Sequence, residues 1–130
     1  MSVFATDTEV YEAIAAMFDE ALTHPDIGPE LAASGVILHL ALSEPTTDIV
    51  IDMPGGVAHR GKPADVTPTM TLKAKADVAH EYWLGNVNVG VAIARGAIRV
   101  RGSVPTLVRL AGMAKPLFPL YRARVAPEAS

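Results

Sequence analysis

Four histidines are the residues of this sequence best suited to acid–base or metal chemistry. They are His24, His39, His59 and His80. None of them stands at a spacing typical of metal ligands, and no motif of the zinc-protease kind is present. Cysteine is absent, which excludes disulfides, thiolate metal sites and cysteine nucleophiles. The sequence therefore predicts no metal site and no cofactor.

One histidine has a carboxylate within reach. If residues 44–47 form the loop of a hairpin, His39 lies directly opposite Asp52 on the neighbouring strand. A histidine beside a carboxylate can act in general acid–base catalysis. The same pair can also be an ordinary cross-strand charge pair on a solvent-facing surface of the sheet. We favour the second interpretation, because this register turns both side chains away from any cavity between the sheet and the helices.

Composition limits the classes to which the chain can belong. Its 130 residues are enough for one domain with a real core. Half of them are apolar and 19% are charged, which excludes intrinsic disorder. No apolar run reaches the ~18 residues that a membrane span needs. The N-terminus lacks the basic flank of a signal peptide, so we expect a cytoplasmic protein, and the use of Ala, Val and Arg over Lys indicates a bacterial one.

Charge is divided unevenly along the chain. Residues 1–59 contain ten acids and no Lys or Arg, whereas residues 60–130 contain eleven bases and four acids. Either the two halves face each other, or the basic end meets an anionic partner. Nucleic acid is not expected as that partner, because the overall charge is −3 and no recognisable binding motif is present.

Hydrophobic periodicity predicts an α+β fold. Helical spacing runs from Val10 to Leu22, after a capping box at Thr6 and Glu9 and before a stop at His24-Pro25. We expect a five-stranded, mostly antiparallel sheet with the helices packed on one face. Because Pro116 and Pro119 interrupt the pattern, residues 116–121 are not expected to form a regular helix. The further expected helices are Pro29–Ser34, Ala76–Leu84, Val87–Ala94 and Val104–Ala114, and the expected strands are Val36–Leu42, Asp48–Met53, Val57–Arg60, Thr69–Lys73 and Ala97–Arg101.

Three consecutive blocks in the second half of the chain carry a resemblance to a known family. They are Asp65-Val66-Thr67-Pro68-Thr69-Met70-Thr71-Leu72, then Tyr82-Trp83-Leu84-Gly85-Asn86, then Ile93-Ala94-Arg95-Gly96-Ala97-Ile98-Arg99-Val100-Arg101-Gly102. In this order they resemble the sterol carrier protein type-2 domain. The resemblance covers nearly the whole chain as a single domain, residues 1–130, although residues 1–35 match only in type. It implies a non-enzymatic lipid binder that holds a fatty acid, acyl-CoA, a sterol or a phospholipid between sheet and helices.

The alternation in the strands and the apolar stripe of the helix at Val104–Ala114 predict which side chains would line such a cavity. For Trp83, a buried anchor between helix and sheet is the alternative to a wall of the lipid site. For the helix at Val104–Ala114, the alternative is a plain core helix. The expected lining residues are Met70, Leu72, Trp83, Ile98, Val100, Leu107, Leu110 and Leu117.

The basic residues near the C-terminus suggest a separate function, which is contact with a membrane. Lys115, Arg122 and Arg124, together with Phe118 and Tyr121, would form a transient docking end for an anionic membrane surface around the cavity mouth. The alternative is that these bases only complement the acidic half.

Two other functions stay open. One is a small isomerase or cyclase that uses His39, Asp52 or His59 in a pocket. The other is an accessory domain that binds another protein through its acidic first helix. The enzyme needs titratable groups inside the cavity, and the inward positions that can be assigned hold none. Neither the natural ligand nor the oligomeric state follows from the residues.

Overall fold

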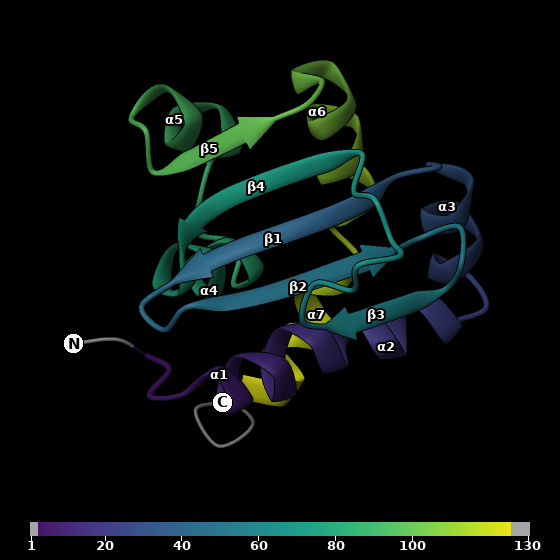
Figure 1. The fold of residues 1–130 in the computed structure, drawn as a ribbon, viewed down its shortest axis with the longest axis horizontal. Helices are drawn as coiled ribbons and strands as arrows, with labels where there is room; N and C mark the ends of the chain where they lie inside the picture. Colours follow the sequence, from purple (N-terminus) through teal and green to yellow (C-terminus); the bar gives the residue numbers. More distant parts are fainter. Residues whose placement is uncertain (1–2, 126–130) are drawn as a thin grey trace.

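A computed structural model describes residues 3–125, in which five strands form one sheet (Figure 1). The strand order is β3-β2-β1-β4-β5. β1 and β4 are parallel, and the other three neighbouring pairs are antiparallel, which confirms the expected mostly antiparallel sheet. The strands are β1 (Ile37–Ser43), β2 (Thr47–Asp52), β3 (Val57–Arg60), β4 (Met70–Lys75) and β5 (Ile98–Arg101).

The first helical stretch begins and ends where its caps predict. It consists of α1 (Asp7–Val10), a π-helical turn η1 (Tyr11–Ala15) and α2 (Ala16–Thr23). The Oγ1 atom of Thr6 accepts the backbone N–H of Glu9 at 3.3 Å, and the carboxylate of Glu9 accepts the N–H of Ala5 at 3.0 Å. These two bonds satisfy backbone donors that a helix start leaves open.

The remaining predicted helices are also present, with small shifts at their ends. They are α3 (Ile27–Ala33), α4 (Ala76–Trp83), α5 (Val89–Ala94) and α6 (Val104–Met113). Ser103 caps α6, where its Oγ atom accepts the N–H of Thr106 at 3.2 Å. None of the helices within residues 3–125 is long and apolar enough to cross a membrane.

The expectation for residues 116–121 is wrong. The segment enters α7 (Leu117–Val125), a regular helix. Pro119 is the third residue of that helix. The first four N–H groups of a helix have no partner within it, so the N–H that proline lacks costs nothing there.

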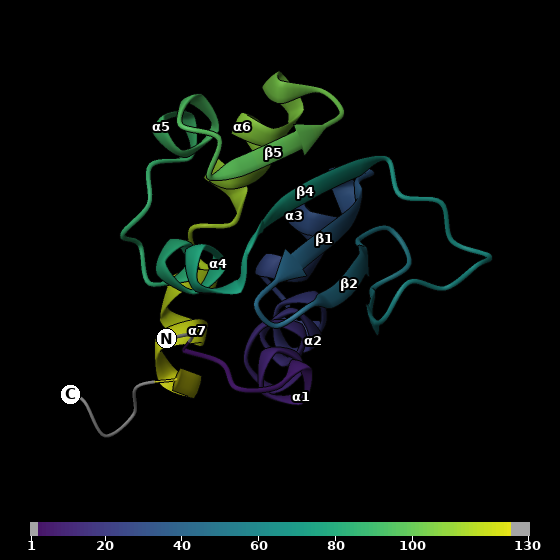
Figure 2. The same ribbon diagram turned by 60° about the vertical axis from the view of Figure 1, so that its left-hand side comes forward.

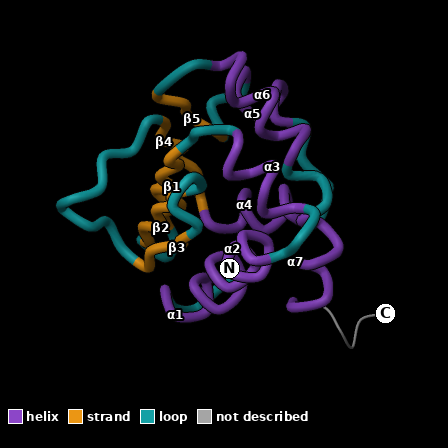
Figure 3. The backbone as a smooth tube through the Cα atoms, turned by 90° about the vertical axis from the view of Figure 1, so that its right-hand side faces the viewer, coloured by secondary structure: helices purple, strands orange, loops and turns teal. Residues whose placement is uncertain are grey.

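The helices lie on one face of the sheet, and the connection between β3 and β4 lies on the other (Figure 3). Turning the molecule shows α4 beside α7, below the end of the sheet that carries α5 and α6 (Figure 2). The hydrophobic core fills the space between sheet and helices. Ile14, Met17 and Phe18 of the first helical stretch and Ile49 and Ile51 of β2 are almost completely buried there.

The hairpin between β1 and β2 is tighter than predicted. Leu42 pairs with Thr47, whereas a loop at 44–47 would pair it with Ile49, so the register differs by two residues. His39 therefore lies opposite Val50, and Asp52 lies opposite Ile37. A slip of two residues keeps each side chain on its expected face, because the side-chain period of a strand is two, but it changes every cross-strand partner.

Candidate functional site

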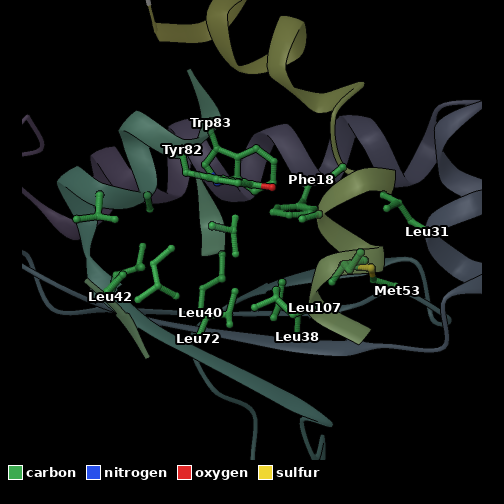
Figure 4. A pocket seen from close by; sticks show the side chains of 18 residues that line it. Phe18, Leu31, Leu38, Leu40, Leu42, Met53, Leu72, Tyr82, Trp83 and Leu107 are labelled. Carbon is green, nitrogen blue, oxygen red and sulfur yellow. The ribbon is translucent and has the colours of Figure 1, made fainter. Parts of the chain in front are cut away.

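An apolar cavity of about 80 Å³ lies between the sheet and the helices. Its floor is formed by leucines of β1 and β4, and Tyr82, Trp83 and Phe18 stand above them (Figure 4). The helices that enclose it come from both ends of the chain. The lining consists of Phe18, Leu31, Leu38, Leu40, Leu42, Met53, Leu72, Ala74, Val78, Ala79, Tyr82, Trp83, Val89, Ile98, Leu107, Leu110, Ala111 and Ala114.

Strand alternation explains the floor. Leu38, Leu40 and Leu42 occupy every second position of β1 and point to the helix side, and Leu72 pairs beside Leu40 on the parallel neighbour β4. Ile98 of β5 continues the same face, beside Ala74. Three adjacent strands thus present one continuous aliphatic surface.

Four aromatic rings form the opposite wall and its support. The ring of Trp83 packs edge to face against Phe18 at a centroid distance of 5.4 Å and against Tyr82 at 4.9 Å. Phe118 of α7 packs behind them, 5.6 Å from Tyr82 and 6.1 Å from Trp83. Edge-to-face pairs at these distances are favourable arrangements of aromatic rings. Trp83, which is 5% exposed, is therefore both a buried anchor and part of the cavity wall.

The chemistry that the lining offers is limited to one phenol. Among the described residues that form it, Tyr82 alone has a titratable side chain, and no carboxylate, imidazole or amine is present. Burial raises the pKa of the Tyr82 phenol above its ordinary value, so the group stays protonated and neutral at physiological pH. The lining can bury apolar surface and offer one hydroxyl.

The exposure of the lining residues indicates where the cavity reaches the surface. Those on α2, α3 and β1 are buried. On the α4 side, Val78, Ala79 and Tyr82 are half-buried, as are Val89 at the start of α5 and Ala111 on α6. We place the mouth of the cavity between α4 and α5 on one side and α6 on the other.

A second, polar hollow of about 360 Å³ lies on the surface between α4 and α5. Asp77 and Glu81 of α4 line one side of it, and Val91 and Arg95 of α5 line the other. Val78 belongs to both hollows, so the apolar cavity and the polar hollow adjoin at this side chain.

Five of the eight side chains predicted to line the cavity do so. They are Leu72, Trp83, Ile98, Leu107 and Leu110. Contact with a ligand stays a prediction for all five. Alternation and helical spacing were sufficient to find them.

The other three expected lining residues lie elsewhere in the core. Met70 and Val100 share the inward face of their strands with Leu72 and Ile98, and they pair with Leu38 and Leu72, which line the cavity, but they are not part of the lining themselves. Leu117 is completely buried in the first turn of α7. They are not part of the lining of the cavity, and contact with a ligand stays a prediction for them too.

Sequence reasoning also missed part of the lining. Phe18, Leu31 and Met53 belong to segments before β4, and the first helical stretch resembles the family only in type. The apolar stripe that includes Phe18 was visible, but a stripe does not distinguish a residue packed in the core from one beside a cavity.

The expected docking end around α7 is wrong at Tyr121. At Lys115, Phe118, Arg122 and Arg124 it stays a prediction, although three of these four have partners within the protein. Tyr121 is completely buried, and its hydroxyl is hydrogen-bonded to Nδ1 of His80 at 2.7 Å. Phe118 packs against Trp83, as described above. Arg122 donates to the carbonyl of Leu84 at 3.0 Å, and Arg124 pairs with Glu20 at 3.0 Å. Lys115 is exposed.

The two charged halves of the chain do face each other in part. Arg60 pairs with Asp19 at 2.8 Å, and the pair of Arg124 and Glu20 joins α7 to α2. Lys75 lies 3.5 Å from Glu44. The acidic face of the first helical stretch is therefore partly occupied by bases of the same chain, which leaves less of it for another protein.

The histidine–carboxylate pair exists, but with a different carboxylate. Nε2 of His39 lies 2.7 Å from Oδ1 of Asp48, which is diagonal to it across the hairpin. Asp52 instead accepts the N–H of Gly55 in the following turn at 2.9 Å. His39 was expected to face solvent, but its side chain is buried, with 7% of the residue exposed. His59 lies opposite Val50, so it shares the face of His39, away from the cavity.

The fold is shared with several solved structures. Sterol carrier protein 2 from Yarrowia lipolytica, in its apo form, matches with a TM-score of 0.67 at 16% identity, covering 97% of this chain and 99% of that one. Sterol carrier protein 2 like-3 from Aedes aegypti matches with a TM-score of 0.68 at 15% identity, covering 86% and 99%. A Thermus thermophilus protein described as possibly a sterol carrier protein matches with a TM-score of 0.59 at 22% identity, covering 97% and 93%.

Comparison with protein-family models gives no match, and neither does comparison with curated proteins. At identities of 14 to 22%, the likeness rests on the arrangement of the backbone. It covers nearly the whole chain and includes the five-stranded sheet and the helices that enclose the cavity. The chain has the fold of the sterol carrier protein 2 domains.

Proposed function

We propose that this protein binds a hydrophobic ligand between its sheet and helices and passes it on without chemical change. The ligand is a fatty acid, an acyl-CoA, a sterol or a phospholipid. One observation carries the proposal: the cavity between sheet and helices is apolar throughout, apart from the hydroxyl of Tyr82. The fold shared with sterol carrier protein 2 structures supports it.

The energetics of burial are sufficient for binding. Each methylene removed from water contributes about 0.8 kcal/mol, so a sixteen-carbon chain gains ~13 kcal/mol in gross terms. Association and ordering remove a large part of this gain. Micromolar or tighter affinity therefore needs no charged contact, and a lining without charges favours ligands by their length and shape.

The cavity must open further to take a whole acyl chain. An apolar cavity of about 150 Å³ accommodates one benzene molecule, and pockets for larger ligands have roughly 300–1,000 Å³. At about 80 Å³, this cavity holds only the beginning of a chain. The segment most suited to move is α5, which Gly85 and Gly96 bracket at positive φ angles of 87° and 77°. Displacing α5 would enlarge the cavity at its mouth, because Val89 lies there.

Binding is favoured over catalysis by the position of the titratable groups. His39, Asp52 and His59 lie on the opposite face of the sheet from the cavity. The side chain of His80 points away from the lining, towards Tyr121 and Phe4. A ligand in the cavity would meet a single neutral phenol and no pair of groups that could exchange a proton with it.

The direct test is native mass spectrometry of protein purified without detergent. The proposal predicts a non-covalent mass that disappears on denaturation and is identified as a lipid after extraction. Delipidated protein should then take up a fatty acid or lysophospholipid in a ratio of one to one. Protein that carries no lipid, and that binds no fatty acid, sterol or phospholipid after delipidation, contradicts the proposal.

A further inference from the structure

The seven bases of residues 82–125 fall into two groups. Those of α7 are used within the protein, as described above for Arg122 and Arg124. Those between α4 and α7 are exposed and make no ion pair within residues 3–125. They are Arg95, Arg99, Arg101, Arg109 and Lys115.

Four members of this second group, all except Lys115, are on or next to elements at one end of the molecule. In Figures 1 and 2, α5, β5 and α6 lie together, at the opposite end from α1 and α2. Residues 82–125 contain seven bases and no Asp or Glu. The elements that carry Arg99, Arg101 and Arg109, and the end of α5 that Arg95 follows, are therefore at the opposite end from the acidic first helical stretch.

Exposed apolar side chains gather at the same end. Of the five large apolar side chains that residues 3–125 leave exposed, three are on α5 and α6: Val91, Val104 and Val108. Val108 is the most exposed of them, at 60%. Apolar side chains grouped with bases on a protein surface are typical of a contact surface.

The two faces of α6 have different surroundings. Leu107, Leu110 and Ala111 line the cavity. Val104, Val108 and Arg109, on the outer face, are exposed. Lys115 follows at the end of the helix. One helix of ten residues thus has the cavity on its inner side and an apolar, basic surface on its outer side.

From these observations we infer that the outer face of α6, with Val91 and Arg95 of α5, docks on an anionic lipid bilayer. The surface is defined here as Val91, Arg95, Val104, Val108, Arg109 and Lys115, and we call it the α5–α6 surface. Its valines would enter the interfacial region and its bases would meet lipid phosphates. The carboxylates that line the polar hollow, Asp77 and Glu81, lie on α4, across the hollow from Val91 and Arg95.

Docking at this surface would bring the cavity mouth to the membrane, because the mouth lies between α5 and α6. A role of this docking in delivering ligand rests on the proposed lipid binding. The docking itself does not, since vesicle binding can be measured with no ligand in the cavity.

The test compares two pairs of substitutions with the same change of charge. R109Q/K115Q alters the α5–α6 surface. R99Q/R101Q removes two exposed bases that have no ion-pair partner, on the opposite face of the sheet. In the β4–β5 ladder, Arg99 lies opposite Lys73 and Arg101 lies opposite Thr71. Both variants are first checked for an unchanged circular dichroism spectrum and melting temperature.

Binding is measured by flotation with vesicles of phosphatidylcholine, with and without phosphatidylglycerol. The unaltered protein should bind the anionic vesicles and lose binding as salt is raised. R109Q/K115Q should weaken this binding by at least about tenfold, because each base near an anionic membrane contributes about fivefold. R99Q/R101Q should weaken it by less than about twofold, because its bases lie on the far side of the sheet from the membrane.

The apolar part of the surface has a matched control as well. Val108→Ser should weaken vesicle binding, whereas Val57→Ser, at a valine of β3 that is 45% exposed, should leave it unchanged. If R109Q/K115Q and R99Q/R101Q weaken vesicle binding equally, the effect is one of net charge alone and the inference is overturned. So would an absence of binding to anionic vesicles, or binding to an acidic polypeptide and not to vesicles of similar charge.

Failure of this inference can be distinguished from failure of the proposed function. If the unaltered protein takes up a fatty acid but does not bind anionic vesicles, the docking surface alone is overturned. Vesicle binding without uptake of any lipid overturns the proposed function and leaves the docking surface intact.

Discussion

The ring of Phe18 meets the ring of Trp83 edge to face in the wall of the cavity, with centroids 5.4 Å apart and planes at 87°. The contact joins the first helical stretch to α4, which is far away in the sequence. Because Phe18 is 1% exposed and Trp83 is 5% exposed, the pair is sealed from solvent on its outer side. A ligand in the cavity would lie against these rings, and Trp83 is the only tryptophan of the chain. Its fluorescence can therefore report on the cavity.

Filling the cavity should remove ligand binding without unfolding the protein. Ala111 of α6 lines the mouth, and Ala111→Leu adds three carbon atoms there. We expect affinity for a fatty acid to fall at least about tenfold, because two displaced methylenes lose ~0.8 kcal/mol each. The free energy of unfolding should change by less than about 1.5 kcal/mol.

The matched control for that variant is Ala123→Leu, on the exposed side of α7. It makes the same chemical change away from the cavity and should leave affinity unchanged. Isothermal titration with a soluble fatty acid measures both variants. Unaltered affinity in Ala111→Leu would show that ligand does not occupy this cavity.

Replacing His39 should affect stability and leave ligand binding intact. His39 lies on the opposite face of the sheet from the cavity and is bonded to Asp48. His39→Ala should change ligand affinity by less than about threefold and cost about 1–2 kcal/mol of unfolding free energy, which is typical of a buried hydrogen bond. Asp52→Ala should cost less, because Asp52 is only half-buried and holds one turn N–H.

Urea unfolding and ligand titration of both variants check this prediction. A turnover assay on candidate isomerase or cyclase substrates gives the decisive contrast. A loss of turnover by orders of magnitude in either variant would favour an enzyme over a carrier.

Tyr121 should make the protein lose stability at alkaline pH. Burial, with a smaller effect of Glu81, raises the pKa of its phenol above the ordinary value of about 10. The folded state therefore keeps a proton that the unfolded state releases. The stabilisation is complete below pH 10 and falls as pH rises further.

Tyr121→Phe tests this effect. At pH 7 the variant should lose about 1–2 kcal/mol, because Nδ1 of His80 loses its hydrogen-bond partner. Between pH 9 and 11, its stability should fall less steeply than that of the unaltered protein. Equal slopes in urea unfolding at a series of pH values would show that the Tyr121 phenol does not carry the effect.

The sequence was sufficient to predict most elements of the fold. Period-two alternation located the strands, and 3.6-residue periodicity, with a capping box at Thr6, located helices. The same patterns found Leu72, Ile98 and Leu107, whose inward direction depends only on local geometry. The parallel pairing of β1 with β4 could not be found in this way, because local pattern does not specify which strands are neighbours.

The remaining features depend on contacts that a local pattern does not encode. The β1–β2 register depends on how tightly residues 44–46 turn, so Asp48 took the place of Asp52 beside His39. Pro119 was expected to break a helix, but its effect depends on whether it stands in the first turn. Tyr121 was expected at a membrane surface, but the packing of α7 against α2 and α4 places it in the core.

The most direct test of the lipid-binding account is quenching of Trp83 fluorescence by a brominated fatty acid. Bromine quenches tryptophan only at close contact, and Trp83 lies in the cavity wall. The account predicts saturable quenching at one equivalent, no quenching by the unbrominated acid, and recovery when the unbrominated acid competes. Ala111→Leu should weaken the effect, and Ala123→Leu should not. Uptake of the brominated fatty acid without quenching of Trp83, or quenching that does not saturate, would contradict the account.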